Sequence, residues 1–257
     1  MSAMSILENK KGLVLGIANK HSIAYGCAKA MRAAGAELAV TYLGPKAEPY
    51  VRPLAESLEC PIIMACNVEV PGELEALYER IDKLWGRLDF VLHSIAFAPK
   101  ADLHGRVVDC SKEGFAQSMD VSVHSFIRMA KRAEPLMSNG GCLLSMTYYG
   151  AEKVVDLYNV MGPVKAALEA SARYMAAELG SKGIRVNTIS PGPLKTRAAS
   201  GIDHFDDLME KAAAKAPEHR LVSTDDVGAL ASFLVSDQGR SITGDTIFVD
   251  AGYHVVD

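Results

Sequence analysis

The chain has 257 residues, of which 49% are hydrophobic and 23% are charged, and its formal net charge is −4 at pH 7. This composition supports a substantial core and excludes a disordered protein. Because the basic residues are scattered and the net charge is negative, we expect neither a nucleic-acid partner nor a membrane surface. No apolar run approaches the roughly 18 residues of a membrane span, and the first residues lack a signal-peptide core, so a cytoplasmic location is expected.

The cysteines and histidines give no sign of a disulfide framework or a metal site. Five cysteines are an odd number and none forms a CxxC pair, which argues against both a disulfide-stapled domain and a zinc ribbon. The seven histidines are scattered without metal-ligand spacing, so no metal ion is expected. His93 and His124 stand in apolar surroundings and are predicted to be structural residues with satisfied ring nitrogens.

Short apolar runs of strand length alternate with longer segments in which apolar residues recur at helical spacing. Because the runs are apolar throughout, their strands are expected to be buried on both faces, as in a parallel sheet covered by helices. This order predicts a Rossmann-type, doubly wound α/β fold with a seven-stranded parallel sheet. No linker or repeat interrupts the chain, so residues 1–257 are expected to form a single domain. The predicted strands are 11–17, 36–42, 61–66, 87–94, 141–147, 184–190 and 245–251.

The carboxyl ends of the predicted strands are the expected ligand site, because ligands of open parallel sheets bind there, near the point where strand order reverses. Gly16 allows a tight turn after the first strand, and Ser22 is a good N-cap for the next helix. A pyrophosphate could meet free amide groups and the positive end of that helix. The motif is not G-x-G-x-x-G, and a lone glycine after a strand more often makes only a turn. The positions that the strand ends bring to this edge are Gly16, Leu43, Asn67, Ser94, Tyr148 and Pro191.

The end of the second predicted strand bears on cofactor choice. It lacks the Asp or Glu that would accept hydrogen bonds from the adenosine ribose of NAD. Lys46, shortly afterwards, could attract the 2′-phosphate of NADPH or could simply begin the next helix. The residues themselves leave the choice between NADH and NADPH open.

Two pairs of a tyrosine and a lysine follow the fifth predicted strand, and their spacing separates them. Tyr149 and Lys153 match the Tyr-xxx-Lys spacing of ordinary short-chain dehydrogenases, but only three residues separate Tyr149 from Ser145, where that family has about a dozen. We therefore interpret Tyr149 and Lys153 as loop residues with a structural role. Tyr158 instead follows Ser145 by thirteen positions and precedes Lys165 by seven.

Tyr158 and Lys165 would lie on nearly the same face of a single helix, because seven residues make about two turns. Pro163 lacks an N–H and belongs in a first helical turn, so Tyr158 is expected at or just before the helix start. A packed tyrosine and a solvated lysine without function are the alternative. The position of the pair after the fifth strand, at the ligand edge, favours a catalytic role.

The segment 193–217 has the least regular pattern and directly follows a predicted strand end. Ile202, Phe205, Leu208 and Met209 could line one face of a helix there. Such a face commonly packs on the core, but its location also allows a substrate-binding lid. The sequence leaves both interpretations open.

Several of these motifs stand in segments that resemble the bacterial enoyl-[acyl-carrier-protein] reductases, a divergent branch of the short-chain dehydrogenase/reductase family. Tyr-x6-Lys carries much of the likeness, and His93-Ser94-Ile95-Ala96 stands where ordinary ketoreductases tend to have Asn-Asn-Ala-Gly. Leu43 in place of a polar residue, Asn67 in place of Asp, and Pro163 depart from the family pattern; the first two bear on cofactor choice. The similar segments are 16–26, 93–99, 147–170, 185–202 and 249–253.

The resemblance implies that NADH, or alternatively NADPH, reduces a trans-2-enoyl thioester of acyl carrier protein in fatty acid biosynthesis. It implies that Tyr158 is the catalytic tyrosine, that Lys165 holds the nicotinamide ribose, and that Tyr148 lines the acyl pocket near the thioester. Ala98 would lie beside the substrate. The residues it implies at the dinucleotide are Gly16, Ser22, Ile23, Asn67, Val68, Ile95, Lys165, Leu194, Lys195 and Thr196.

The resemblance also implies a homotetramer and a carrier-protein partner. The acidic surface of that partner could meet a group of cations that a solvated helix face would explain equally well, namely Lys195, Arg197, Lys211 and Lys215. Two other functions remain open. A ketoreductase or carbonyl reductase would use the same fold and cofactor but protonate an alkoxide, and the Tyr-x6-Lys spacing weighs against it. A non-catalytic dinucleotide-binding regulator would tolerate loss of Tyr158 or Lys165, and both are present.

Overall fold

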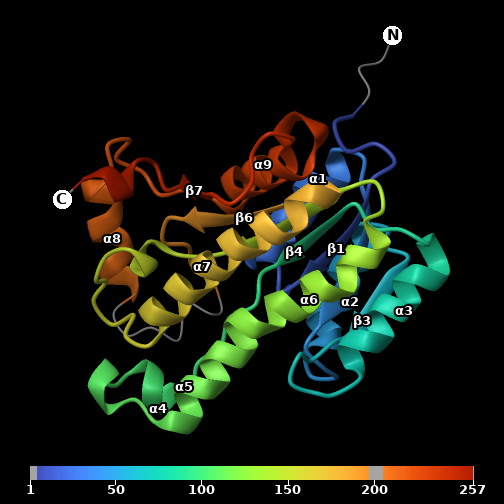
Figure 1. Ribbon diagram of the computed structural model, residues 1–257. Helices are drawn as coiled ribbons and strands as arrows, with labels where there is room; N and C mark the ends of the chain where they lie inside the picture. The colour runs from blue at the N-terminus through green and yellow to red at the C-terminus, as the bar shows by residue number, and fades with distance from the viewer. Residues whose placement is uncertain (1–4, 197–204, 257) are drawn as a thin grey trace.

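The computed structural model describes residues 5–196 and 205–256 (Figure 1). The strands of this part of the chain form one sheet in the order β3-β2-β1-β4-β5-β6-β7, and every neighbouring pair is parallel. The predicted Rossmann-type, doubly wound fold is confirmed, and each of the seven predicted strands is present. The strands are β1 (Lys11–Leu15), β2 (Glu37–Tyr42), β3 (Ile62–Ala65), β4 (Phe90–His93), β5 (Gly141–Met146), β6 (Ile184–Pro191) and β7 (Thr246–Val249).

Most of the apolar runs form strands whose two faces are buried, whereas β3 and β7 are only partly buried. Leu13 and Leu15 belong to the core on one face of the sheet, whereas Val14 between them belongs to the core on the other. Most strands are shorter than their apolar runs, since the backbone turns before the burial ends. β1 stops at Leu15 because Gly16 adopts φ 106°, a left-handed conformation that suits glycine.

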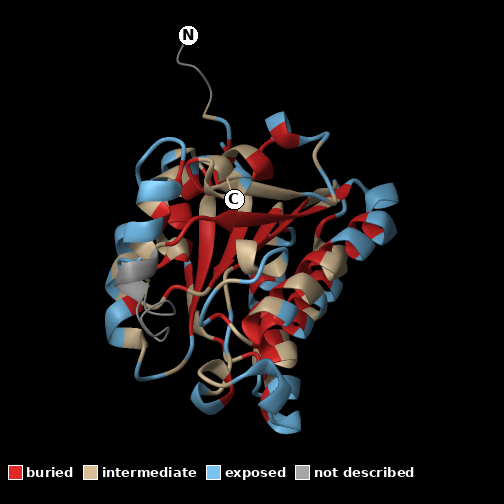
Figure 2. Ribbon diagram, turned by 90° about the vertical axis from the view of Figure 1, so that its left-hand side faces the viewer, coloured by how far each residue is buried: buried red, intermediate tan, exposed pale blue. Residues whose placement is uncertain are grey.

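Helices cover both faces of the sheet, and Figure 2 shows the middle of the sheet buried between helices whose outer sides are exposed. The helices on the first face are α3 (Glu73–Trp85), α6 (Ser125–Ala133) and α7 (Met161–Leu179). Those on the second face are α1 (Ile23–Ala33), α2 (Glu48–Ser57) and α9 (Thr224–Val235). The others are α4 (Lys100–Leu103), α5 (Lys112–Met119) and α8 (Phe205–Lys215). No helix within the described residues is long and apolar enough to cross a membrane.

Glycines bring α1 and α9 into close contact. A Cβ atom at position 228 would lie 2.8 Å from the carbonyl oxygen of Gly26 and 2.9 Å from the Cβ of Ala30. A Cβ at Gly26 would lie 2.5 Å from the Cβ of Thr224. Only hydrogen atoms fit at Gly26 and Gly228, so the two helix backbones approach more closely than larger residues would allow.

A π-helical turn, Asp120–His124, joins α5 to α6. The Ser122 hydroxyl in this turn accepts a hydrogen bond from the Phe97 amide at 3.0 Å and lies 3.2 Å from the Phe97 carbonyl oxygen. Phe97 belongs to the segment that follows β4. The turn therefore anchors the segment that carries Ile95 and Ala98 at the carboxyl edge of the sheet, and such turns are frequent at functional sites.

Candidate active site

The turn after β1 lies at the point where strand order reverses, between β1 and β4. A Cβ at Gly16 would lie 2.0 Å from the carbonyl oxygen of Ser94, so only glycine fits. Ser22 is the N-cap residue of α1, as predicted, but its hydroxyl does not cap the helix. It accepts hydrogen bonds from the amides of Ala18 and Asn19 at 2.9 and 3.1 Å. Ser22 thus shapes the loop, and Ile23 begins the helix whose positive end suits an anion.

Hydrogen bonds within the loop after β3 and from α3 and α6 hold this loop in place. The Asn67 side-chain oxygen accepts a hydrogen bond from the Glu69 amide at 3.0 Å, and Glu73 accepts one from the Asn67 amide at 2.6 Å. Arg128 of α6 donates to the Val68 carbonyl at 2.8 Å. These contacts fix Asn67 and Val68 beyond the carboxyl end of β3, on the edge that carries Gly16.

Tyr148 and Tyr158 form an edge-to-face pair whose ring centroids are 4.9 Å apart. Tyr148 follows the end of β5, and Ala98 and Ile95 pack with it on the core of the same sheet face. Tyr158 is 9% exposed, and a Cβ at Gly150 would lie 2.5 Å from its ring. The two tyrosines are therefore assembled from separate segments by tertiary packing.

The backbone on either side of Tyr158 adopts left-handed conformations, with φ 64° at Leu157 and φ 44° at Asn159. Such conformations are costly for residues other than glycine and occur often at functional sites. The Asn159 side chain donates a hydrogen bond to the carbonyl of Leu103 in α4 at 2.7 Å, which anchors this turn. The sequence analysis missed Asn159; the tolerance of asparagine for this conformation was the available signal.

Lys165 lies in α7, which begins at Met161, so Tyr158 precedes the helix start and Pro163 stands in the first turn, as predicted. The Lys165 side chain is only 5% exposed, and its Nζ donates a hydrogen bond to the Met146 carbonyl at 2.7 Å. This placement is incompatible with a solvated surface lysine. Burial lowers the pKa of Lys165 to about 8, although the nearby Glu169 opposes that shift.

The two tyrosine hydroxyls lie in environments that favour their neutral forms. Burial raises the pKa of Tyr158, and the neighbouring Tyr148 and Glu169 raise it further. Burial likewise raises the pKa of Tyr148. Both hydroxyls are therefore protonated at neutral pH and can act as hydrogen-bond donors.

His93 connects β4, β5 and the π-helical turn through a buried polar chain. Its Nδ1 lies 2.9 Å from the Ser145 hydroxyl, and its Nε2 lies 2.7 Å from the Ser125 hydroxyl, which in turn donates to Val121. Burial lowers the pKa of His93 to about 3, so the ring is neutral. The prediction of a satisfied structural histidine is confirmed for His93. For His124 the predicted apolar surroundings were wrong, because its side chain is largely exposed, but its Nδ1 has a partner in Asp120 at 2.9 Å.

The Tyr-xxx-Lys pair lies outside the long helix, as predicted. Tyr149 begins a short 3-10 helix, Tyr149–Ala151, and its ring contacts Tyr253 with a centroid separation of 5.6 Å. Lys153 is exposed. Lys46 is likewise exposed beyond the end of β2. Among the described residues, no side chain forms a hydrogen bond with it.

The segment after β6 is described only in part. Leu194 is half-buried and packs against two separate hydrophobic clusters. Lys195 is exposed, and the Thr196 amide donates a hydrogen bond to the Leu194 carbonyl at 2.8 Å. Residues 197–204 of the predicted lid, 193–217, lie outside the described residues, and they include Arg197 and Ile202. The later part of that segment contains α8, where Lys211 and Lys215 are exposed.

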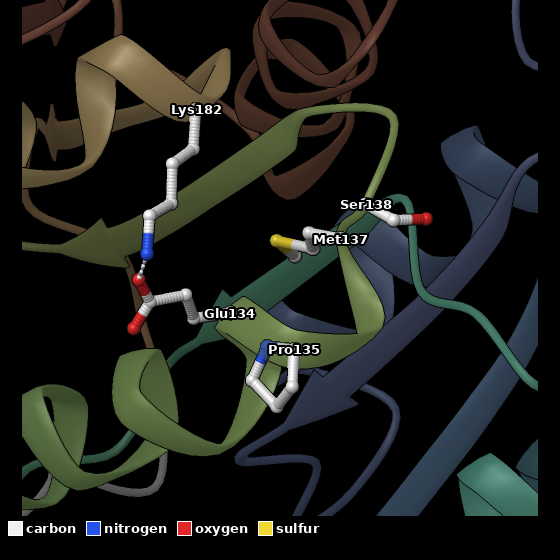
Figure 3. Close-up of a pocket in the computed structure, with 5 residues that line it drawn as sticks. All are labelled: Glu134, Pro135, Met137, Ser138 and Lys182. Carbon is white, nitrogen blue, oxygen red and sulfur yellow. Dashed lines mark hydrogen bonds and ion pairs between the residues drawn. The ribbon is translucent and has the colours of Figure 1, made fainter.

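A hollow with a volume of 440 Å³ lies elsewhere among the described residues (Figure 3). Glu134 and Lys182 form an ion pair there, beside Pro135, Met137 and Ser138. These residues directly precede β5 and β6, so the hollow is at the amino ends of the strands. Because ligands of parallel sheets bind at the carboxyl ends, we do not assign the site to this hollow.

A doubly wound parallel sheet with a buried tyrosine and lysine beyond its fifth strand defines an oxidoreductase of the short-chain dehydrogenase/reductase class. A family model described as enoyl-(acyl carrier protein) reductase matches residues 16–254. The chain belongs to this enoyl reductase family.

Individual relatives agree with that assignment. The chain is 47% identical to enoyl-[acyl-carrier-protein] reductase [NADH] 1 of Rhizobium meliloti, over 99% of this chain and 93% of the relative. It is 48% identical to the crystal structure of the enoyl reductase of Anaplasma phagocytophilum in complex with NAD, with a TM-score of 0.95 and coverage of 100% and 98%. It is 42% identical to the Bacillus cereus enoyl reductase with NADP⁺ and an indole naphthyridinone, with a TM-score of 0.96 and coverage of 99% and 100%.

Proposed function

We propose that this chain is an enoyl-[acyl-carrier-protein] reductase of fatty acid biosynthesis that uses NADH to reduce trans-2-enoyl thioesters. The observation that carries the proposal is the group formed beyond β5 by the buried Tyr158 and Lys165 and the partly buried Tyr148. It combines two protonated hydroxyls with one cation. NADH supplies the hydride that reaches the β-carbon of the substrate. The protein must then stabilise negative charge on the thioester oxygen.

Tyr158 meets that requirement as a hydrogen-bond donor. Its raised pKa keeps the hydroxyl protonated, and a bond to the thioester oxygen strengthens as enolate charge develops there. Tyr148, packed edge-to-face on Tyr158, lines the acyl pocket near the thioester, and Ala98 lies beside the substrate. Burial of the Tyr158 ring limits the access of water to the reacting oxygen.

Lys165 has two roles in this proposal. Its Nζ has further donors beyond the one that bonds to Met146, and these hold the nicotinamide ribose. Its positive charge lies in a buried environment, where it also favours the enolate. Both roles need the protonated amine, which the pKa of about 8 allows at neutral pH.

The dinucleotide fits the donor groups at the carboxyl edge of the sheet. The α1 N-terminus beyond Gly16 presents its positive end to the pyrophosphate, since the Ser22 side chain does not cap it. No carboxylate stands directly after β2, where Leu43 is exposed, so the preference for NADH over NADPH rests on the family. The residues proposed at the dinucleotide are Gly16, Ser22, Ile23, Asn67, Val68, Ile95, Lys165, Leu194, Lys195 and Thr196.

Carrier-protein docking and assembly extend the proposal. Lys211 and Lys215 are exposed on α8, and the Lys215 ammonium lies 5.6 Å from the ring centroid of Tyr253. With Lys195 and Arg197 they would meet the acidic carrier protein. A homotetramer, a cytoplasmic location and a single domain with a lid at 193–217 complete the proposal.

The test is the loss of reduced-nicotinamide absorbance with an enoyl thioester, run beside a β-ketoacyl thioester, with NADH and NADPH in separate reactions. We expect oxidation of NADH with the enoyl substrate. Oxidation with only the keto substrate would identify a ketoreductase instead. Binding of NADH without turnover of either substrate would favour a non-catalytic dinucleotide-binding regulator.

A further inference from the structure

A buried carboxyl group lies beside the candidate catalytic residues without a role in the mechanism above. Glu169 is one turn after Lys165 in α7 and only 7% exposed. Its Oε1 accepts a hydrogen bond from the Thr147 hydroxyl at 2.6 Å. Along the same stripe of α7, positions 172 and 176 are buried alanines. An acidic residue at such a position costs free energy unless its interactions offset the desolvation.

Thr147 stands between two residues of the proposed site. The carbonyl of Met146 before it accepts the Lys165 ammonium at 2.7 Å, and Tyr148 after it packs on Tyr158. The Thr147 amide donates to the Ile189 carbonyl of β6 at 2.9 Å. The turn from β5 into Tyr148 is therefore held by β6 through its backbone and by α7 through the Thr147 hydroxyl.

The Lys165 bond to Met146 and the Thr147 bond to Glu169 join α7 to the end of β5 and have opposite donor directions. Lys165 of α7 bonds to Met146, the last residue of β5, and Glu169 of α7 bonds to Thr147, the residue that follows it. On α7 the two bonds are one helical turn apart. Removing either one leaves a buried polar group without its partner. Together they set the distance and rotation of α7 relative to the end of β5.

We propose that Glu169, acting through the Thr147 hydroxyl, is a positioning residue that holds Met146 and Tyr148 in place against Lys165. The inference rests on the proposed function, because it assumes the roles given to Tyr148 and Lys165. A second consequence is electrostatic. The Glu169 carboxylate favours the charged form of Lys165 from one turn away.

The charged groups that face Glu169 limit how its own ionisation can respond. Burial raises the pKa of Glu169, and Glu152 raises it further. The Thr147 hydroxyl, Arg173 and Lys165 act in the opposite direction. Arg173 and Glu152 are exposed, so Thr147 and Lys165 are the buried partners of the carboxyl group.

The experiment compares Thr147→Val, which keeps the side-chain shape without the hydroxyl, with Thr147→Ser, which keeps the hydroxyl. In the full chain with NADH and an enoyl thioester, we expect Thr147→Val to lower kcat about tenfold, as for the loss of one positioning hydrogen bond. KM should change less than kcat, because binding contacts remain. Thr147→Ser should restore kcat to within about twofold of the unsubstituted chain. The control is Ser171→Ala, which removes a hydroxyl bonded to Ala167 on the same helix and should leave kcat unchanged.

The charge of Glu169 is tested by Glu169→Gln, whose amide oxygen still accepts from Thr147. Lys165 loses the carboxylate that raises its pKa, so its charge should disappear at lower pH than in the unsubstituted chain. NADH affinity, measured by fluorescence titration across pH, should accordingly fall at lower pH. If Glu169→Gln does not fold, as judged by thermal unfolding, the Thr147 variants still decide the inference.

Equal kcat for Thr147→Val and the unsubstituted chain would overturn the inference, as would a Thr147→Ser variant as impaired as Thr147→Val. An unshifted pH dependence in a folded Glu169→Gln variant would remove the electrostatic part. Failure of the proposed function is a separate result, since an inactive unsubstituted chain would show it directly. The pH dependence of NADH binding would then still report on Glu169, because it needs no turnover.

Discussion

Two packing regions on opposite faces of the sheet differ in the kind of residues that they bury. Where α1 meets α9, Gly26 and Gly228 have no side chains, so the two helix backbones come into close contact. The surrounding core is largely apolar. Where α7 meets the end of β5, the interface instead buries Lys165, Glu169 and Thr147. The first arrangement gains contact area at little desolvation cost. In the second arrangement, hydrogen bonds offset the desolvation cost of the buried polar groups.

The difference teaches which substitutions should affect stability and which should affect catalysis. A close apolar contact has no capacity to bind a ligand or move charge, so its loss should appear in the free energy of unfolding. A satisfied polar interface at the ligand edge can do both, and its loss should appear in turnover and cofactor affinity. Four predictions test this division.

The largest effect is expected from Tyr158→Phe on the polar side. The ring packing against Tyr148 and Gly150 remains, but the proposed donor to the thioester oxygen is lost. We expect kcat to fall about 100-fold or more, the effect of losing one donor to a developing oxyanion. Fluorescence titration should find NADH affinity retained. Unchanged turnover would remove Tyr158 from the mechanism.

The next effect concerns the charge of Lys165. Burial lowers its pKa to about 8 in the folded chain, so the charge is present at neutral pH and is lost as the pH rises through that value. The NADH association constant should then fall by about tenfold per pH unit at higher pH if the charged form alone binds. Lys165→Met should bind NADH weakly and without this pH dependence. A Lys165→Met variant that titrates like the unsubstituted chain would refute the assigned role.

On the apolar side, Gly228→Ala should destabilise the fold without changing the chemistry. The new Cβ would lie 2.8 Å from a backbone oxygen that cannot move freely. We expect the free energy of unfolding to fall by about 1–3 kcal/mol, as for other overpacked cores. Gly180→Ala is the matched control, because a Cβ there meets nothing within 4 Å. Denaturant unfolding measures both, and a similar loss in the two variants would contradict the close-contact argument.

The smallest effect is expected from the Tyr-xxx-Lys pair. Tyr149→Phe keeps the ring contact with Tyr253, and Lys153→Ala removes an exposed side chain. Each kcat should stay within about twofold of the unsubstituted chain, since such surface changes have small effects. A tenfold loss in either variant would show that this pair takes part in the reaction and would revive the ketoreductase interpretation.

Much of the fold could be predicted because the strands are short, continuous apolar runs. All seven were identified, and the helix boundary near Pro163 followed from proline geometry. The errors lie where a local pattern does not determine burial. His124 stands among apolar residues in the sequence, yet the π-helical turn directs its side chain to the surface, where Asp120 pairs with it.

The candidate site was predictable only in its most specific spacings. Tyr158 and Lys165 followed from the Tyr-x6-Lys spacing, and Gly16 from its place after a strand. Asn159, Thr147 and Glu169 were missed. A glutamate within a helical segment is most simply interpreted as exposed, and its partner Thr147 is 22 positions away, so no local signal connects them.

The sequence by itself determined the seven strands, the parallel doubly wound class and the family resemblance. It also singled out Tyr158 and Lys165 as site candidates through their spacing. Periodicity and turn chemistry are local properties, and they can be evaluated from neighbouring residues alone. Only the tertiary structure decided that Lys165 is buried, that Tyr148 packs on Tyr158, and that Glu169 reaches Thr147. Burial and hydrogen-bond pairing depend on residues distant in the chain. The perturbed pKa of Lys165 depends on the same distant residues, because the desolvation that causes it exists only in the folded protein.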